Sequence, residues 1–197
     1  MSVEPASRHA GKKRVLAFSG SDRGGSWNAR LLALVAHEIE SQRLTVTKVS
    51  LRGLGLPIYD GDLEAESGVP AEAVDLRRLI GDHDGLLIAC PEHNGSVTAL
   101  LKNALDWCSR PVGGEAPLAP FQMKPVLIVG ASVSPFGAVR ALGHLRAILS
   151  KMGAMVVPED LAVPHAPTAF ADDGFAAEAT GVVATRVVRA FASLLED

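Results

Sequence analysis

The chain has 197 residues, 48% of them apolar, which is enough for one domain with a sizeable core. Its 19 Lys and Arg residues nearly balance 22 Asp and Glu residues, and a formal charge of -3 suggests neither a nucleic-acid-binding surface nor an acidic steering surface. No stretch approaches the roughly 18 apolar residues of a membrane span. The two cysteines, Cys90 and Cys108, fall within predicted regular structure, which favours buried thiols in a reducing cytoplasm over a disulfide.

Residues 1–13 are polar and lack apolar periodicity, so they predict a flexible N-terminal tail before a single domain over residues 14–197. Beyond the tail, continuous apolar runs alternate with segments of helical periodicity. The apolar runs predict buried strands at residues 15–18, 44–49, 85–90, 125–129 and 155–157. The periodic segments predict helices at residues 28–41, from Pro70 through Ile80, at 99–107, at 139–152 and at 175–195. This alternation predicts an α/β fold with a doubly wound parallel sheet.

In such sheets, ligands bind at the carboxyl ends of the strands, where the strand order reverses. The loops after the first, third and fourth strands are therefore the candidate site. Two long connections, residues 53–69 and 111–123, could be either substrate loops or surface insertions.

The first of these loops has the composition of a phosphate site. Its glycines, hydroxyl groups and single arginine stand where a helix begins, in the order Gly20, Ser21, Asp22, Arg23, Gly24, Gly25, Ser26, Trp27 and Asn28. Free amides at a helix start and a guanidinium group suit a phosphate dianion, although a simple N-cap at Ser26 is the alternative. The P-loop lysine, the G-x-G-x-x-G fingerprint and an acidic residue after the second strand are all missing. A mononucleotide such as FMN fits better.

The loop after the third strand reads Pro91, Glu92, His93, Asn94, Gly95 and Ser96. Its glycine permits a close approach to a flat ring, and its polar groups offer hydrogen bonds. An ordinary turn followed by a helix cap at Ser96 or Thr98 explains the same residues equally well.

Three segments together resemble the NADPH-dependent FMN reductase family, which includes quinone, chromate and azo-dye reductases. Residues 20–28 are similar to the family signature GSxRxxSxN, and residues 91–111 (PEHNGSVTALLKNALDWCSRP) to its PEYNGSxPGxLKNAxDWxSRP segment. Residues 130–149 (GASVSPFGAVRALGHLRAIL) resemble its third loop and following helix. The resemblance implies a flavodoxin-like fold with a five-stranded parallel sheet, helices on both faces and strand order 2-1-3-4-5.

The resemblance also implies a function, FMN-dependent oxidation of NADPH or NADH with electron transfer to a small acceptor in two half-reactions. The chemistry would reside on the flavin, with no catalytic side chain. The implied phosphate ligands are Ser21, Arg23, Ser26 and Asn28, with Trp27 beside them. Residues Pro91, Glu92, His93, Asn94, Gly95 and Ser96 would line the ring, and Ser132 would close the site. Family members commonly form a homodimer or homotetramer.

Departures from the family pattern bear on acceptor choice, flavin affinity and assembly. His93 replaces a tyrosine, Thr98-Ala99 replaces Pro-Gly, and residues 134–136 alter the third loop. Gly143 replaces an aromatic residue that joins subunits in relatives. Two alternatives stay open. A flavodoxin-like electron carrier would bind the same cofactor without oxidising NAD(P)H, and the loop departures leave open a family member that has lost tight flavin binding. No histidine or acidic pair has the spacing of a metal site, so no metal is expected.

Overall fold

The computed structural model describes residues 12–21 and 23–196 of the chain. The main sheet contains β1 (Arg14–Ser19), β2 (Thr45–Val49), β3 (Gly85–Ala89), β4 (Pro125–Ala131), β5 (Met155–Val156) and β6 (Leu161–Val163). A separate small hairpin contains β7 (Phe170–Ala171) and β8 (Gly174–Phe175). Most of the predicted tail, residues 1–13, lies outside the described residues.

The helices are α1 (Trp27–Ser41), α2 (Gly61–Ser67), α3 (Ala71–Asp82), α4 (Ala99–Cys108), α5 (Val139–Lys151), α6 (Ala166–Ala169) and α7 (Glu178–Glu196). Two short 3-10 segments, η1 (Arg52–Leu54) and η2 (Ala119–Phe121), lie in the connections. The closing helix begins later than the expected residue 175, because Phe175 belongs to β8. The short elements α2, α6 and the hairpin were not predicted.

All pairings in the main sheet are parallel, and the order is β2-β1-β3-β4-β5. The predicted flavodoxin-like topology is therefore confirmed. One difference concerns the outer edge, where β6 also pairs with β4, through the register Val129↔Leu161 to Ala131↔Val163. The edge strand is thus interrupted, and its second half lies beside the carboxyl end of β4.

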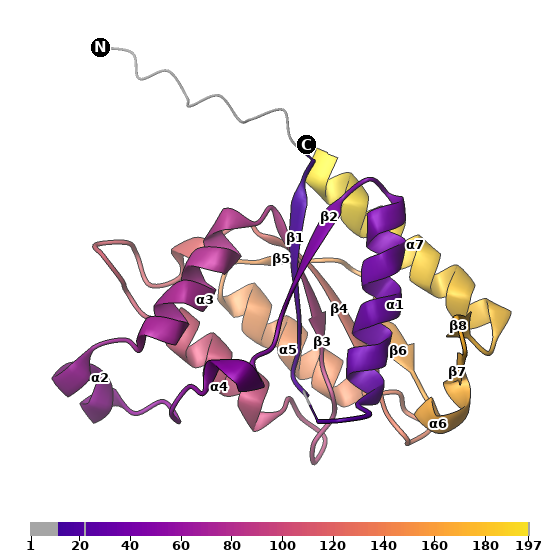
Figure 1. The fold of residues 1–197 in the computed structure, drawn as a ribbon, viewed down its shortest axis with the longest axis horizontal. Helices are drawn as coiled ribbons and strands as arrows, with labels where there is room; N and C mark the ends of the chain where they lie inside the picture. Colours follow the sequence, from indigo (N-terminus) through magenta and orange to yellow (C-terminus); the bar gives the residue numbers. More distant parts are fainter. Residues whose placement is uncertain (1–11, 22, 197) are drawn as a thin grey trace, which may run out of the picture.

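Two layers of helices cover the sheet, with α1 and α7 on one face and α3, α4 and α5 on the other (Figure 1). Alternate residues of the strands feed the two cores, as in β1, where Val15 and Ala17 face α1 while Leu16 and Phe18 face the opposite layer. The central strand β3 is buried throughout, which explains its uninterrupted apolar sequence. Among the described residues, no helix has the length and apolar character needed to cross a membrane.

Candidate functional site

The three candidate loops follow adjacent strands, at the carboxyl ends of those strands. Ser19 pairs with Ala89, and Ala89 pairs with Val129, so β1, β3 and β4 end close together. The loops that follow β1 and β3 lie at the lower edge in Figure 1, beside the first turn of α1. The structure therefore brings the three predicted segments to a common edge.

The first loop leads into α1 with free hydrogen-bond donors. Ser26 is the N-cap of α1, and its hydroxyl oxygen accepts a bond from the Ala29 amide at 3.3 Å. Within the described part of the chain, the amides of Trp27 and Asn28 have no acceptor, as is normal for the first turn of a helix. Arg23 is exposed, and a Cβ added at Gly24 would meet no atom within 4 Å. The start of α1 is thus open on the side of the loop.

These donors fit the phosphate group of FMN. The Ser21 and Ser26 hydroxyls, the Arg23 guanidinium and the first-turn amides can each donate to a phosphate oxygen. The positive end of the α1 dipole points towards the same place.

Two residues of the predicted cofactor site, the phosphate ligand Asn28 and its neighbour Trp27, make side-chain contacts within the protein. The buried Asn28 side chain donates from Nδ2 to the Ala131 carbonyl at 2.8 Å, and its Oδ1 accepts from the Ala131 amide at 2.9 Å. The Trp27 ring stacks on Phe170, with centroids 5.8 Å apart and planes 2° from parallel. Asn28 therefore fastens α1 to the end of β4, and Trp27 fastens it to the β7–β8 hairpin.

A residue that the sequence showed only as a possible cap, Thr98, joins the first loop to the second. Its hydroxyl donates to the Gly20 carbonyl at 2.9 Å and accepts from the Leu101 amide at 3.3 Å, where it caps α4. A Cβ added at Gly20 would lie 2.8 Å from this hydroxyl oxygen and 3.1 Å from Pro91. Glycine is thus required at position 20 by close packing.

The second loop is a tight hairpin with an exposed tip. The backbones of His93 and Ser96 exchange two hydrogen bonds of 3.0 Å. Asn94 and Gly95 between them have φ angles of 52° and 75°, as in a type I′ turn. The side chains of His93 and Asn94 are exposed, and the Ser96 hydroxyl bonds to His144 Nδ1 at 2.9 Å. The Asn94-Gly95 turn is therefore confirmed, and the helix cap is Thr98 rather than Ser96.

Glu92, within the same loop, points towards α5 and is only 8% exposed. Its carboxylate accepts bonds from the Arg140 amide at 3.1 Å, the Ala141 amide at 3.3 Å and the Arg140 guanidinium at 2.7 Å. These partners lie 48 and 49 residues away and could not be predicted from the sequence.

The third loop is held in a compact turn by Ser132. Its hydroxyl donates to Ser134 Oγ at 3.1 Å and accepts from the Ser134 amide at 3.2 Å. The Ser132 amide donates to the Val163 carbonyl in β6 at 3.0 Å. Val133 and Phe136 remain 65% and 54% exposed, so the loop presents apolar groups to solvent beside the candidate site.

The two long connections lie at opposite ends of the parallel strands. Residues 111–123 lead to the amino end of β4, and the buried Arg77 holds them through bonds to the carbonyls of Ala116 and Pro117, at 2.8 and 2.7 Å. That connection is a surface insertion far from the three loops. Residues 53–69 begin at the carboxyl end of β2 and pack on α4, where Trp107 Nε1 donates to the Pro57 carbonyl at 2.8 Å.

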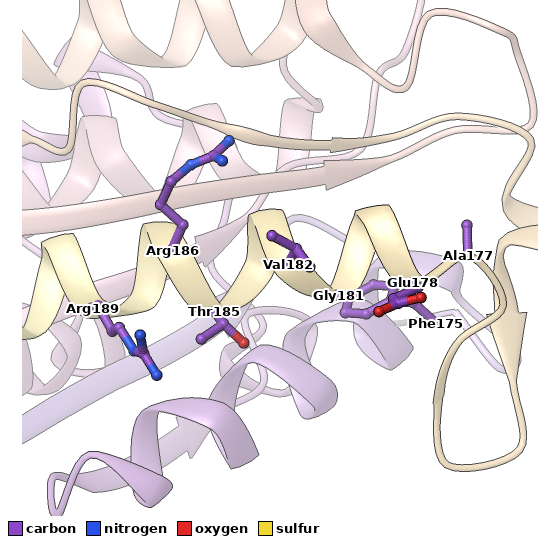
Figure 2. A pocket seen from close by; sticks show the side chains of 8 residues that line it. All are labelled: Phe175, Ala177, Glu178, Gly181, Val182, Thr185, Arg186 and Arg189. Carbon is purple, nitrogen blue, oxygen red and sulfur yellow. The ribbon is translucent and has the colours of Figure 1, made fainter.

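A depression of about 640 Å³ on the outer face of α7 contains none of the predicted site residues. The side chains of Arg186 and Arg189 point to different sides of the helix (Figure 2). They do not converge on a common point, so this depression does not compete with the three loops. The described residues also contain no group of three or more His, Cys, Asp or Glu side chains placed to hold a metal ion.

Comparison with known proteins agrees with this geometry. Residues 13–168 match the model of the NADPH-dependent FMN reductase family. The chain belongs to this family. It is 40% identical over 137 residues to an NAD(P)H-dependent FMN reductase of Pseudomonas aeruginosa, covering 69% of each chain. It is 38% identical over 146 residues to a quinone reductase of Escherichia coli K12, covering 74% of each chain.

Among solved structures, the chain is similar to FerB, a flavoenzyme NAD(P)H:(acceptor) oxidoreductase from Paracoccus denitrificans. The TM-score is 0.77 at 30% identity, with 93% of this chain and 97% of FerB covered. Membership of the FMN reductase family confirms the predicted activity, an FMN-dependent NAD(P)H oxidoreductase, and with it the cofactor FMN and the donor NAD(P)H.

Proposed function

We propose that this FMN reductase holds its flavin across the three loops at the carboxyl ends of β1, β3 and β4, and that it reduces quinones. The observation that carries the proposal is the position of those loops at a single sheet edge, with the donor-rich start of α1 at one end. When bound, FMN would supply the chemistry, namely hydride transfer from NAD(P)H and transfer of two electrons to the acceptor in a second half-reaction.

The first loop binds the phosphate. Ser21, Arg23 and Ser26 donate to its oxygens together with the amides of Trp27 and Asn28. The Asn28 and Trp27 side chains shape this end of the site, because they hold α1 against β4 and against Phe170.

The backbone of the second loop, from Pro91 to Ser96, lines the flavin ring. Its reciprocal bonds fix the backbone before the cofactor arrives, so the amides at the tip can stabilise negative charge on the reduced ring without rearrangement. Ser132 closes the site from the end of β4.

Quinones are the acceptor class that the site suits best. The exposed Val133 and Phe136 side chains border the three loops with apolar surface, which a flat, weakly polar acceptor can contact. The Escherichia coli relative is named a quinone reductase, and a Burkholderia relative, 36% identical over 136 residues, a 2-hydroxy-1,4-benzoquinone reductase.

The assembly that we propose is a homodimer or homotetramer in the cytoplasm. Ile58, on the connection that packs against α4, is 86% exposed. A shallow groove between α4 and α5 has Val97, Ala99, Ala147 and Ile148 in its lining, beside three polar residues, so this side of the molecule offers some apolar surface to a second copy. Cys90 and Cys108 are free and buried, which suits a reducing compartment.

Anaerobic titration tests the function. The purified protein, loaded with FMN, is mixed with one equivalent of NADPH, and the visible flavin band is followed before and after addition of 1,4-benzoquinone. We expect the band to bleach and then to return as hydroquinone forms. A bound flavin that NADPH and NADH leave oxidised would contradict the reductase assignment and would favour an electron carrier.

A further inference from the structure

The start of α5 lacks a capping side chain of its own. The residue at its N-cap position is Ala138, which has no hydroxyl, amide or carboxylate group and adopts a φ of 69°. The amides of the first turn would therefore need acceptors from elsewhere, because they have no partner within the helix. Two of them, those of Arg140 and Ala141, point to Glu92 Oε2.

Glu92 thus supplies the missing cap from another loop. Its negative charge lies at the positive end of the α5 dipole, and Oε1 also pairs with the Arg140 guanidinium. Because the carboxylate is almost completely buried, these contacts replace its hydration. The Arg140 guanidinium also stacks on Phe136, 4.7 Å from the ring centroid, so the pair extends to the exposed part of the third loop.

With this contact, each pair among the three loops is joined by a side-chain hydrogen bond. Thr98 ties the second loop to Gly20 in the first, and Asn28 ties the start of α1 to Ala131 at the end of β4. Glu92 ties the second loop to the start of α5, directly after the third loop. Each loop is therefore fixed to both of the others by a buried side chain.

We infer that Glu92 is a positioning residue of the FMN site. Its carboxylate does not touch the cofactor but caps α5, and in this way it holds the second and third loops at the spacing that the flavin requires. The inference rests on the proposed location of the flavin site. It replaces the direct contact to the ring that the sequence resemblance implies for Glu92.

Three variants separate the cap from the ion pair, and a fourth serves as the control. E92A removes both, E92Q keeps an amide oxygen that can accept from the helix amides, and R140A removes only the guanidinium. E159Q is the matched control, because Glu159 pairs with Arg186 in an exposed ion pair outside the three loops. Circular dichroism checks that each variant is folded.

The dissociation constant of FMN, measured by quenching of flavin fluorescence, is the first readout. We expect E92A to raise it about tenfold, as for a lost hydrogen bond to a charged group. We expect the dissociation constant to rise by no more than about threefold for R140A and to stay unchanged for E159Q. For E92Q we expect an increase between those of R140A and E92A.

Hydrogen–deuterium exchange of the FMN-free protein is the second readout. E92A should speed exchange of the Arg140 and Ala141 amides at least about tenfold, while the amides of β4 keep wild-type protection. If FMN affinity falls while the amides of α5 keep their protection, Glu92 contacts the flavin directly and the inference is wrong. If the wild-type protein binds FMN tightly and the dissociation constant of E92A is unchanged, this inference alone is overturned. If the wild-type protein binds no FMN, the proposed function itself is overturned.

Discussion

Asn28 and Ala131 are joined by two hydrogen bonds, one in each direction between the side-chain amide and the backbone, at 2.8 and 2.9 Å. They lie 103 residues apart in the chain. The amide side chain matches the backbone as another strand would, and it fixes the start of α1 beside the carboxyl end of β4. The open first turn of α1 is placed at the sheet edge by this contact.

Substitution N28D tests the contact. The carboxylate can still accept from the Ala131 amide, but its second oxygen would face the Ala131 carbonyl without a proton to share. We expect a loss of about 2–3 kcal/mol in the free energy of unfolding, measured by urea denaturation at pH 7. A loss below about 0.5 kcal/mol would show that the pair contributes little.

Gly20 and Gly24 provide a matched pair within one loop. An added Cβ at Gly20 would lie 2.8 Å from Thr98 Oγ1, whereas one at Gly24 would meet nothing within 4 Å. We therefore expect G20A to lower the free energy of unfolding by about 1–3 kcal/mol and G24A to change it by less than about 0.5 kcal/mol. Equal effects in thermal unfolding would refute the packing argument.

His93 borders the exposed tip of the second loop, where the family pattern has tyrosine. Because the side chain is exposed and its backbone carries the hairpin bonds, H93Y should leave the loop intact and change the surface offered to the acceptor. We expect the relative kcat/KM values for several quinones to change about threefold or more, with FMN affinity retained. Unchanged ratios across the series would rule out a role for His93 in acceptor choice.

The two thiols should be unreactive in the folded protein. Burial, assisted by the charge of Glu92, raises the pKa of Cys90 to about 12, and burial likewise raises the pKa of Cys108 to about 12. Both thiols are therefore protonated at pH 8 in the native state. Ellman's reagent should react at least about a hundredfold more slowly than with free cysteine until denaturant exposes both groups. Rapid labelling without denaturant would contradict the buried positions.

The same shifts have a consequence for stability at high pH. The folded chain keeps its thiol protons while the unfolded chain releases them above the ordinary pKa of 9.0. The free energy of unfolding therefore keeps its full value below pH 9 and falls as the pH rises towards 12. In that interval each thiol lowers the free energy of unfolding by about 1.4 kcal/mol per pH unit. Urea denaturation of wild type and of a C108A variant at several pH values would resolve the contribution of Cys108.

The sequence predicted what depends on local pattern. The uninterrupted apolar run of β3 and the helical periodicity of α1 fix the layers, while Ser26 and the Asn94-Gly95 turn follow from residue preferences over a few positions. The short edge strand β6 escaped prediction because three residues carry too little periodicity.

The contacts that assemble the site could not be predicted in the same way. Thr98 with Gly20 and Glu92 with Arg140 join residues 78 and 48 positions apart, and a single sequence does not show which residues face each other at such distances. The family signature identified the right segments, but it does not distinguish side chains that face a ligand from those that hold the loops together. For this reason the signature places Asn28 and Glu92 at the cofactor, although their side-chain polar atoms form hydrogen bonds within the protein.

The central claim is that the open first turn of α1, with Arg23, binds the phosphate of FMN. The most direct measurement compares the dissociation constants of FMN and riboflavin for the wild-type protein, by flavin fluorescence at fixed ionic strength. Because several charge-assisted hydrogen bonds depend on the phosphate, we predict that FMN binds at least about a hundredfold more tightly and that R23A narrows this ratio. Equal affinities for FMN and riboflavin would contradict the account.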